Sequence, residues 1–298
     1  MRDIARNKWV QFAGLATVGA LALSACGGSS SSSSSAATAA ASAAAPASSA
    51  AAAECTTPTP VKLQLQWFVQ SQFAGYYAAK DMGYYKDACL DVTILEGGVD
   101  IVPQTVLAQG GADFAISWVP KALSSREQGA GIVDVAQVYQ RSGTRQVSWA
   151  DSGIKTSADL KGKKVGNWGF GNEYELFAGI SKAGLNASSD VELVQQQFDM
   201  KALLSREIDA AQAMTYNEYA QLLEAKNPKT GKLYTAEDFT VLDWNTEGTA
   251  MYQDAIWASQ ERLADAAYQA TTQAFVQASL KGWIYCRDNA QKCADIVV

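Results

Sequence analysis

The 298-residue chain contains no histidine, and this absence limits the chemistry that its other side chains can perform. Without an imidazole there can be no Ser-His-Asp triad, no Cys-His dyad and no histidine ligand for a metal ion. The charge balance, 24 Lys and Arg against 30 Asp and Glu, argues against a nucleic-acid partner, because nucleic acids require a basic face. We therefore expect no histidine-based catalysis and no metal or cofactor site in this protein.

Aromatic side chains follow several of the predicted strands. They are Trp67, Trp118, Trp168, Phe170 and Tyr216. Ligands of open α/β sheets bind beyond the carboxyl ends of the strands, where such residues would gather. Aromatic rings at these positions predict a cleft in which a flat heterocycle stacks. Packing in the core is the alternative for each of them.

Two glutamates, Glu173 and Glu218, lie at the predicted N-termini of helices and are the leading polar candidates for binding a ligand. The alternative is helix capping, in which a Ser, Thr or Asn is followed three residues later by an acid. Asn172 would pair in this way with Glu175, which leaves Glu173 free to bind a ligand. Thr215 would pair with Glu218 itself.

The negative sign of these carboxylates favours one class of ligand. A helix N-terminus by itself attracts sulfonate or phosphate, but a carboxylate placed there repels an anion. An aminopyrimidine can donate hydrogen bonds to a carboxylate while its ring stacks on an indole. Gln66 is a further polar candidate, and the residues expected to bind the ligand are Trp67, Gln72, Trp118, Trp168, Asn172, Glu173, Tyr216, Asn217 and Glu218.

The N-terminus resembles a bacterial lipoprotein signal. Arg2, Arg6 and Lys8 precede an apolar run over residues 9–25, which ends in the sequence LSAC at Cys26. A membrane-spanning anchor is the alternative, but the run is short for one. The resemblance implies a signal peptide over residues 1–25, lipid on Cys26, and a location at the extracytoplasmic face of the membrane. Residues 26–58 would be a Ser/Ala-rich linker, since residues 27–53 contain 10 Ser and 13 Ala.

Four further cysteines remain, an even number in a compartment where disulfides form. Cys286 and Cys293 are close in sequence and form the expected pair. Cys55 and Cys89 would then pair and join the start of the folded domain to the end of its first helix. Four cysteines allow three pairings, so the sequence leaves the connectivity open.

Strands and helices alternate along the rest of the chain, which is typical of βαβ units and parallel sheets. Two such series predict two lobes, with crossings near 147–153 and 243–254 that form a hinge around a cleft. The expected strands cover 61–66, 91–96, 112–117, 132–139, 164–168, 191–195, 209–215 and 239–242. The first lobe would comprise residues 59–148 and a helical return over 247–298, and the second lobe residues 149–246.

Several segments carry a family resemblance: LQWFVQSQFAGYYAAKDMGYYK at 65–86, EGG at 96–98, ADFAI at 112–116, DLKGKKVG at 159–166 and AMTYNE at 213–218. They resemble bacterial solute-binding proteins for thiamine-pyrimidine precursors, riboflavin and sulfonates, a superfamily that includes the fungal thiamine-pyrimidine synthase. The resemblance implies a two-lobed type II periplasmic-binding-protein fold, a small heteroaromatic ligand, and an ABC permease as partner. Pyrimidine-binding relatives carry a Tyr and a Glu where this chain has Tyr216 and Glu218.

The chain departs from this pattern in two ways. The fungal synthase uses histidine and a cysteine cluster, and this chain has neither, so the resemblance favours transport over synthesis. The relatives also continue beyond the point that corresponds to Asp295, so we expect a C-terminal truncation. Together these observations predict a lipid-anchored binding protein of an ABC importer for an aminopyrimidine, with riboflavin or a sulfonate as alternative ligands.

Overall fold

The computed structural model describes residues 55–298. The predicted signal peptide, the lipid site at Cys26 and nearly all of the Ser/Ala-rich linker lie outside these residues. In the part that is described, no helix is both long and apolar enough to span a membrane.

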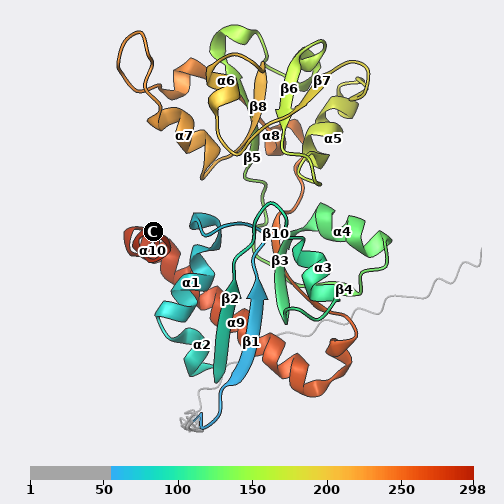
Figure 1. Ribbon diagram of the computed structural model, residues 1–298, viewed down its shortest axis with the longest axis vertical. Helices are drawn as coiled ribbons and strands as arrows, with labels where there is room; N and C mark the ends of the chain where they lie inside the picture. Colours follow the sequence, from blue (N-terminus) through green and yellow to red (C-terminus); the bar gives the residue numbers. More distant parts are fainter. Residues whose placement is uncertain (1–54) are drawn as a thin grey trace, which may run out of the picture. The chain divides into compact units, whose positions relative to one another are not determined.

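The first sheet has five strands in the order β2-β1-β3-β10-β4 (Figure 1). Its strands are β1 (Thr59–Gln64), β2 (Leu90–Leu95), β3 (Phe114–Trp118), β4 (Ile132–Gln137) and β10 (Asp254–Ser259). β1 runs parallel to β2 and β3, whereas β10 is antiparallel to β3 and β4. Every residue of β3 is buried, as expected for a central strand with both faces covered.

Helices cover both faces of this sheet. Successive side chains along β3 point to opposite faces of the sheet. Phe114 and Ile116 pack with Phe275 of a long C-terminal helix on one face. Ala115 packs with Leu107 and Ala122 on the other face. The helices are α1 (Ala74–Asp81), α2 (Tyr84–Asp87), α3 (Pro103–Ala108), α4 (Val119–Glu127), α9 (Ala266–Asp288) and α10 (Ala290–Val297).

The second sheet also has five strands, in the order β7-β6-β8-β5-β9. Its strands are β5 (Thr144–Trp149), β6 (Lys164–Asn167), β7 (Glu192–Gln195), β8 (Ala210–Met214) and β9 (Phe239–Asp243). Ala210 faces a core shared with Leu176 and Ile180, and Ala211 faces a core shared with Leu203 and Leu222. The helices that supply these leucines and Trp244 are α5 (Tyr174–Lys182), α6 (Lys201–Leu204), α7 (Glu218–Glu224) and α8 (Trp244–Glu247).

The expectation of parallel sheets is wrong for two strands, β5 and β10. Each runs antiparallel to both of its neighbours and lies next to an edge strand: β5 between β8 and the edge strand β9, and β10 between β3 and the edge strand β4. Both begin with polar residues that the fold buries, among them Thr144, Gln146 and Asp254, and neither was among the strands expected from the sequence. Because β5 pairs in the second sheet, residues 59–148 are not all in the first lobe. The two segments that connect the sheets are 138–143 and 244–253.

The helical segment that follows β1 is interrupted. α1 ends at Asp81, and Gly83 adopts a left-handed conformation with φ of 75° before α2 begins at Tyr84. Glycine adopts such a φ without the steric cost that a Cβ would bring. The break turns the chain so that Tyr85 packs into the core against Phe275.

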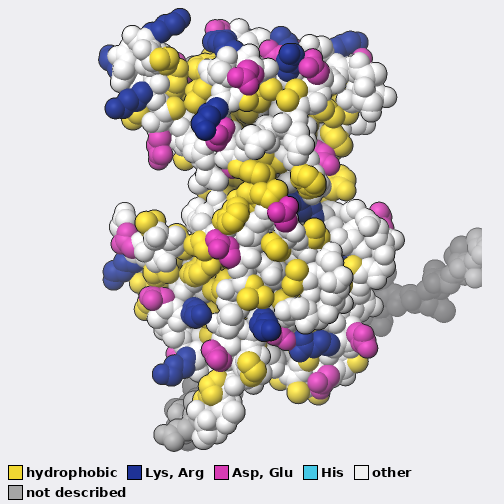
Figure 2. All heavy atoms as spheres, in the orientation of Figure 1, with side chains coloured by type: hydrophobic (Ala, Val, Ile, Leu, Met, Phe, Trp, Pro, Cys, Tyr) yellow, Lys and Arg dark blue, Asp and Glu magenta, His cyan; other side chains and the backbone are white. Residues whose placement is uncertain are grey.

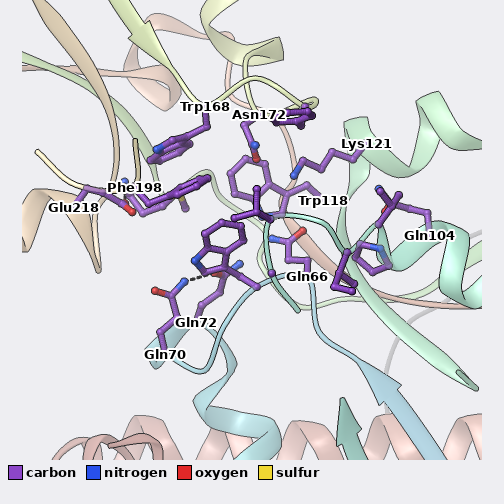
Figure 3. A pocket seen from close by; sticks show the side chains of 18 residues that line it. Gln66, Gln70, Gln72, Gln104, Trp118, Lys121, Trp168, Asn172, Phe198 and Glu218 are labelled. Atoms are coloured by element: carbon purple, nitrogen blue, oxygen red, sulfur yellow. Dashed lines mark hydrogen bonds between the residues drawn. The ribbon is translucent and has the colours of Figure 1, made fainter. Parts of the chain in front are cut away.

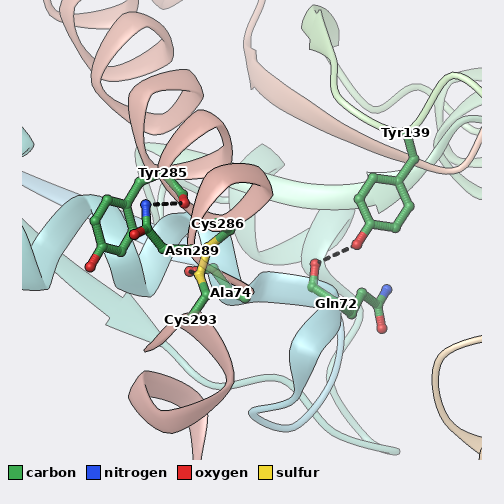
Figure 4. Close-up of a disulfide and its surroundings, with 7 residues drawn as sticks. All are labelled: Gln72, Ala74, Tyr139, Tyr285, Cys286, Asn289 and Cys293. Carbon is green, nitrogen blue, oxygen red and sulfur yellow. Dashed lines mark hydrogen bonds between the residues drawn. A yellow bond between two sulfur atoms is a disulfide. The ribbon is translucent and has the colours of Figure 1, made fainter. Parts of the chain in front are cut away.

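The structure confirms both predicted disulfide pairs, Cys55–Cys89 and Cys286–Cys293. The second joins the end of α9 to α10 and lies against α1, where Cys293 is buried with Ala74 and Ala78 (Figure 4). In the same region the hydroxyl of Tyr139 donates a hydrogen bond to the carbonyl oxygen of Gln72, at 3.1 Å.

Helices α1 and α9 cross at two glycines, Gly75 and Gly282. A Cβ on Gly282 would overlap the carbonyl oxygen of Gly75, and a Cβ on Gly75 would overlap the ring of Trp283. The crossing is therefore closer than side chains would allow. It fixes the start of α1, which follows directly after the polar residues Gln70 and Gln72.

Candidate ligand-binding pocket

A pocket is lined by residues that follow strands of both sheets. Its cavity volume is about 150 Å³. Small-molecule sites are mostly apolar with a few polar groups that fix the orientation of the ligand. On the face that Figure 2 shows, apolar side chains are exposed near the segments that connect the two sheets.

Five aromatic rings line the pocket, and they come from the ends of four strands, β1, β3, β6 and β7. The lining rings are Trp67, Trp118, Trp168, Phe170 and Phe198 (Figure 3). The structure thus brings together four of the five aromatic residues singled out in the sequence, all but Tyr216. Phe198 was missed, although it follows β7 by three residues and so carries the same strand-end signal.

The rings contact each other in two groups. Trp67 lies against Phe198, with ring centroids 4.5 Å apart. Trp118 and Trp168 pack with Met214, and Tyr216 packs against this group from outside the pocket lining. Tyr216 therefore supports the wall in this structure. The indole nitrogen of Trp168 is buried without a hydrogen-bond partner among the described residues, so it is a donor at the pocket wall.

Phe170 differs from the other rings because 74% of its surface is exposed. Its φ is 55°, and the flanking Gly169 and Gly171 have φ of 71° and 83°. Three consecutive left-handed residues hold this ring at the pocket rim, and the two glycines make the turn possible.

Glu218 lines the pocket and is 4% exposed. One carboxylate oxygen accepts a hydrogen bond from the backbone nitrogen of Met214 at 2.9 Å, and the other accepts one from the Asn217 amide at 3.0 Å. The predicted capping pair with Thr215 is wrong, because the Thr215 hydroxyl donates instead to Gly143. Burial raises the pKa of Glu218, while the backbone hydrogen bond from Met214 opposes this rise.

The other polar candidates have different surroundings. Asn172 lines the pocket, and its amide nitrogen donates to the carbonyl oxygen of Gly169 at 2.8 Å. Asn217 does not line it; its side chain bonds Glu218 and Gln221 instead. Glu173 does not line it either, although one of its oxygens is buried without a partner among the described residues.

Gln72 lines the pocket and bonds to a buried carboxylate behind it. Its amide nitrogen donates to both oxygens of Asp254, at 3.1 and 2.9 Å, and its oxygen accepts from Gln70 at 2.7 Å. Burial raises the pKa of Asp254 to about 7, and both this hydrogen bond and the charge of Lys121 oppose the rise.

Gln66 and Gln104 also line the pocket, and the side-chain oxygen of each is buried without a hydrogen-bond partner among residues 55–298.

Lys121, in the first turn of α4, is the charged lining residue that the sequence analysis missed. Its ammonium nitrogen lies 5.2 Å from the ring centroid of Trp118. Burial lowers the pKa of Lys121 to about 8, and the charges of Asp254 and Glu173 oppose this change. The sequence signal was its position three residues after a strand-end tryptophan.

The expected capping role of Glu175 is wrong. Its two oxygens accept hydrogen bonds from the Ser142 hydroxyl at 2.9 Å and from the backbone nitrogen of Met251 at 2.6 Å. Ser142 and Met251 lie in the two different segments that connect the sheets. Gln253 reinforces this network by donating to Ser142 and to Thr144. Glu175 thus ties the two connecting segments together.

The pocket has the composition of a binding site for a flat polar ring. It combines stacking surfaces with one carboxylate, one ammonium group and several amides. Among residues 55–298, no group of three or more His, Cys, Asp or Glu side chains is arranged to hold a metal ion.

Comparison with known proteins places the chain in a family. The model of the family described as NMT1/THI5 like matches residues 70–293, which is most of the chain. The chain belongs to this family. Among the described residues, the match includes every strand except β1 and every pocket-lining residue except Gln66 and Trp67.

Several proteins with similar sequences have names that refer to thiamine, to a pyrimidine or to riboflavin. The formylaminopyrimidine-binding protein of Halalkalibacterium halodurans is 22% identical over 80% of this chain and 69% of its own length. The riboflavin-binding protein RibY of Chloroflexus aurantiacus is 25% identical over 79% of this chain and 65% of its own length. A Haemophilus influenzae protein named for thiamine biosynthesis is 28% identical over 50% of this chain, and the match spans about half of that relative, 48%.

A solved structure confirms the fold. The periplasmic aliphatic sulphonate binding protein SsuA from Escherichia coli superposes with a TM-score of 0.62 at 18% identity, covering 81% of this chain and 74% of that chain. The predicted two-lobed periplasmic-binding-protein fold is therefore confirmed. Identity this low relates the architectures and carries no information about the ligand.

Proposed function

We propose that this protein is the solute-binding component of an ABC importer, and that its ligand is an aminopyrimidine precursor of thiamine. The observation that carries the proposal is Glu218, a buried carboxylate among aromatic rings that line one pocket. An exocyclic amino group can donate a hydrogen bond to this carboxylate while the pyrimidine ring stacks on Trp168 or Trp67.

Electrostatics support this class of ligand over sulfonates. A sulfonate would have to approach the carboxylate of Glu218, which is poorly hydrated and therefore weakly screened. An amino group instead satisfies the carboxylate, and charge-assisted hydrogen bonds of this kind are about twice as strong as neutral ones. The relative named for formylaminopyrimidine binding agrees with this choice.

Riboflavin is the second candidate, and the Chloroflexus relative named for riboflavin binding favours it. Its ring system is also flat and would stack on the same indoles. It has no exocyclic amino group to donate to Glu218, so the aminopyrimidine is the better partner for the carboxylate of this pocket.

Catalysis in the manner of a pyrimidine synthase is not proposed. The chain has no histidine, and its four cysteines among the described residues are all in disulfides. Ligand capture by a binding protein needs neither. We propose that the chain acts on the extracytoplasmic side of the membrane, held by lipid on Cys26, and delivers its ligand to a permease.

Closure around the ligand would follow from the position of the pocket. Trp67 and Trp118 follow strands of the first sheet, whereas Trp168 and Glu218 follow strands of the second. A ligand that contacts both sets favours the conformation in which they are closest. The connecting segments 138–143 and 244–253 would supply the hinge.

A calorimetric titration of the purified full chain tests the proposal. The ligands are an aminopyrimidine with a formylaminomethyl arm, riboflavin, taurine and nitrate. We expect the aminopyrimidine to bind and to quench tryptophan fluorescence, because its ring would lie against indoles. Binding of taurine or nitrate without binding of the aminopyrimidine would overturn the proposed ligand class. Binding of riboflavin alone would favour the second candidate.

A further inference from the structure

We propose that Lys121 is a specificity-determining residue, whose ammonium group binds an oxygen acceptor on the side of the ligand away from the amino group held by Glu218. This assignment rests on the proposed function, because it names a second functional group of the same ligand. Neither Lys121 nor any other cation was anticipated in the pocket from the sequence. In Figure 3 its side chain points toward the central rings, while Glu218 lies on the other side of them.

The first argument is that the ammonium group of Lys121 is available to a ligand. Within residues 55–298 its nitrogen takes part in no salt bridge. The nitrogen lies over the ring of Trp118, 5.2 Å from its centroid, and this ring attracts the charge but offers no hydrogen-bond acceptor. A lysine carries three N–H donors, so an acceptor on the ligand would be its hydrogen-bond partner in the pocket.

The second argument is that the stem of Lys121 is held in place. A Cβ on Gly171 would come within 3.1 Å of Cγ of Lys121, so the loop after β6 lies directly over the stem. Gly171 has φ of 83°, a conformation that favours glycine. The tip of the side chain is therefore directed by packing from the second sheet, although Lys121 belongs to a helix of the first.

The third argument is that the charge is retained at neutral pH. Burial lowers the pKa of the ammonium only to about 8, because Asp254 and Glu173 attract it. At pH 7 most molecules therefore carry a protonated Lys121. A protonated amine facing an apolar wall favours a ligand oxygen over a methyl group, because the methyl group would leave the charge without a partner.

Together these points give the pocket a negatively charged side and a positively charged side. Glu218 follows β8 in the second sheet and requires a donor, whereas Lys121 follows β3 in the first sheet and requires an acceptor. A ring with an amino group at one edge and a carbonyl oxygen on a side arm satisfies both. Such a ligand also contacts groups attached to both sheets.

The test uses two compounds with the same aminopyrimidine ring. One carries a formylaminomethyl arm, and the other a methyl group in its place. The proteins are the full chain, the variant Lys121→Met, which keeps most of the stem volume, and the control Lys86→Met at an exposed lysine. Affinities of both compounds are measured by calorimetry, with thermal unfolding of each protein recorded in parallel.

We expect the unaltered protein to prefer the formyl compound by about tenfold or more, since a hydrogen bond to a charged group commonly contributes this much. In Lys121→Met the preference should fall to less than about threefold, with the affinity for the methyl compound changed by less than about twofold. Lys86→Met should keep the full preference.

Other outcomes overturn the assignment. Equal binding of both compounds by the unaltered protein, or a preference that survives in Lys121→Met, would show that Lys121 does not select the ligand while the aminopyrimidine function stands. An equal loss of both compounds in Lys121→Met would show that the lysine only maintains the pocket. If the unaltered protein binds neither compound, the proposed ligand class fails, and the assignment fails with it.

Discussion

Two carboxylates of the second lobe have similar positions and different surroundings. Glu175 lies in the first turn of α5 after β6, and Glu218 lies in the first turn of α7 after β8. Each is 4% exposed, and burial raises the pKa of each. Yet Glu175 bonds two segments far away in sequence, Ser142 and Met251, whereas Glu218 bonds its own loop and lines the pocket.

The difference shows how little a local motif says about the role of a buried acid. A glutamate in the first turn of a helix is expected to cap that helix. In this protein neither does so in the expected way. The orientation of β5 brings Ser142 to Glu175, whereas the hydrogen-bond partners of Glu218 among residues 55–298 come from its own loop, and Glu218 lines the pocket. One acid therefore supports the connection between the sheets, and the other is the one that we propose binds the ligand.

The largest effect should come from Glu175→Ala. This change leaves the Ser142 hydroxyl and the Met251 amide without their acceptors in a site of low exposure. We expect a loss of about 2–4 kcal/mol in the free energy of unfolding, from about 1–3 kcal/mol for each buried group left unpaired. Urea unfolding followed by circular dichroism measures it. Glu192→Ala, at an exposed glutamate of β7, is the control and should change little. A loss no larger than that of the control would mean that Glu175 does not stabilise the hinge.

Glu218→Gln should have a somewhat smaller effect, and this effect should be on ligand affinity and not on stability. The amide keeps an acceptor for the Met214 nitrogen but loses the charge that we propose holds an amino group. Affinity for the aminopyrimidine should fall about 10- to 100-fold, with little change in unfolding. Calorimetry of this variant beside Glu224→Gln, at an exposed residue of the same helix, separates the two roles. If Glu218→Gln bound normally but unfolded easily, its role would be that of Glu175.

The smallest effect is expected in the pH dependence of stability. Because burial raises the pKa of both acids above the ordinary value of 4.5, the folded state binds protons more tightly than the unfolded state. The free energy of unfolding should therefore fall as pH rises from about 4.5 through the raised pKa. Asp254 contributes with the same sign in every variant, since its pKa is also raised.

Glu175→Gln and Glu218→Gln should each remove part of this slope, which unfolding at a series of pH values measures. Glu224→Gln provides the unaltered slope for comparison. A saturating aminopyrimidine should favour the ionised form of Glu218, and so reduce the contribution of Glu218 but not that of Glu175. Equal reduction of both contributions would argue against a direct contact between the ligand and Glu218.

The site could be predicted from the sequence only in part. Trp67, Trp118 and Trp168 were found because aromatic residues after strands must gather at one edge of each sheet. Lys121 was missed because a lysine in the first turn of a helix is usually exposed to solvent. Tyr216 was expected to bind the ligand, but in this structure it packs behind the wall, since a strand-end position does not decide on which side of a neighbouring ring a side chain lies.

Short-range features were determined by the sequence itself. Local hydrophobic pattern predicted eight of the ten strands among residues 55–298, all but β5 and β10, and the closeness of Cys286 and Cys293 along the chain favoured their pairing. Only the tertiary structure decided that β5 and β10 run antiparallel. Their buried polar residues form hydrogen bonds with partners that are distant in sequence, and Gln72, which donates to Asp254 of β10, is one such partner. The same long-range pairing decided which glutamate supports the hinge and which faces the pocket.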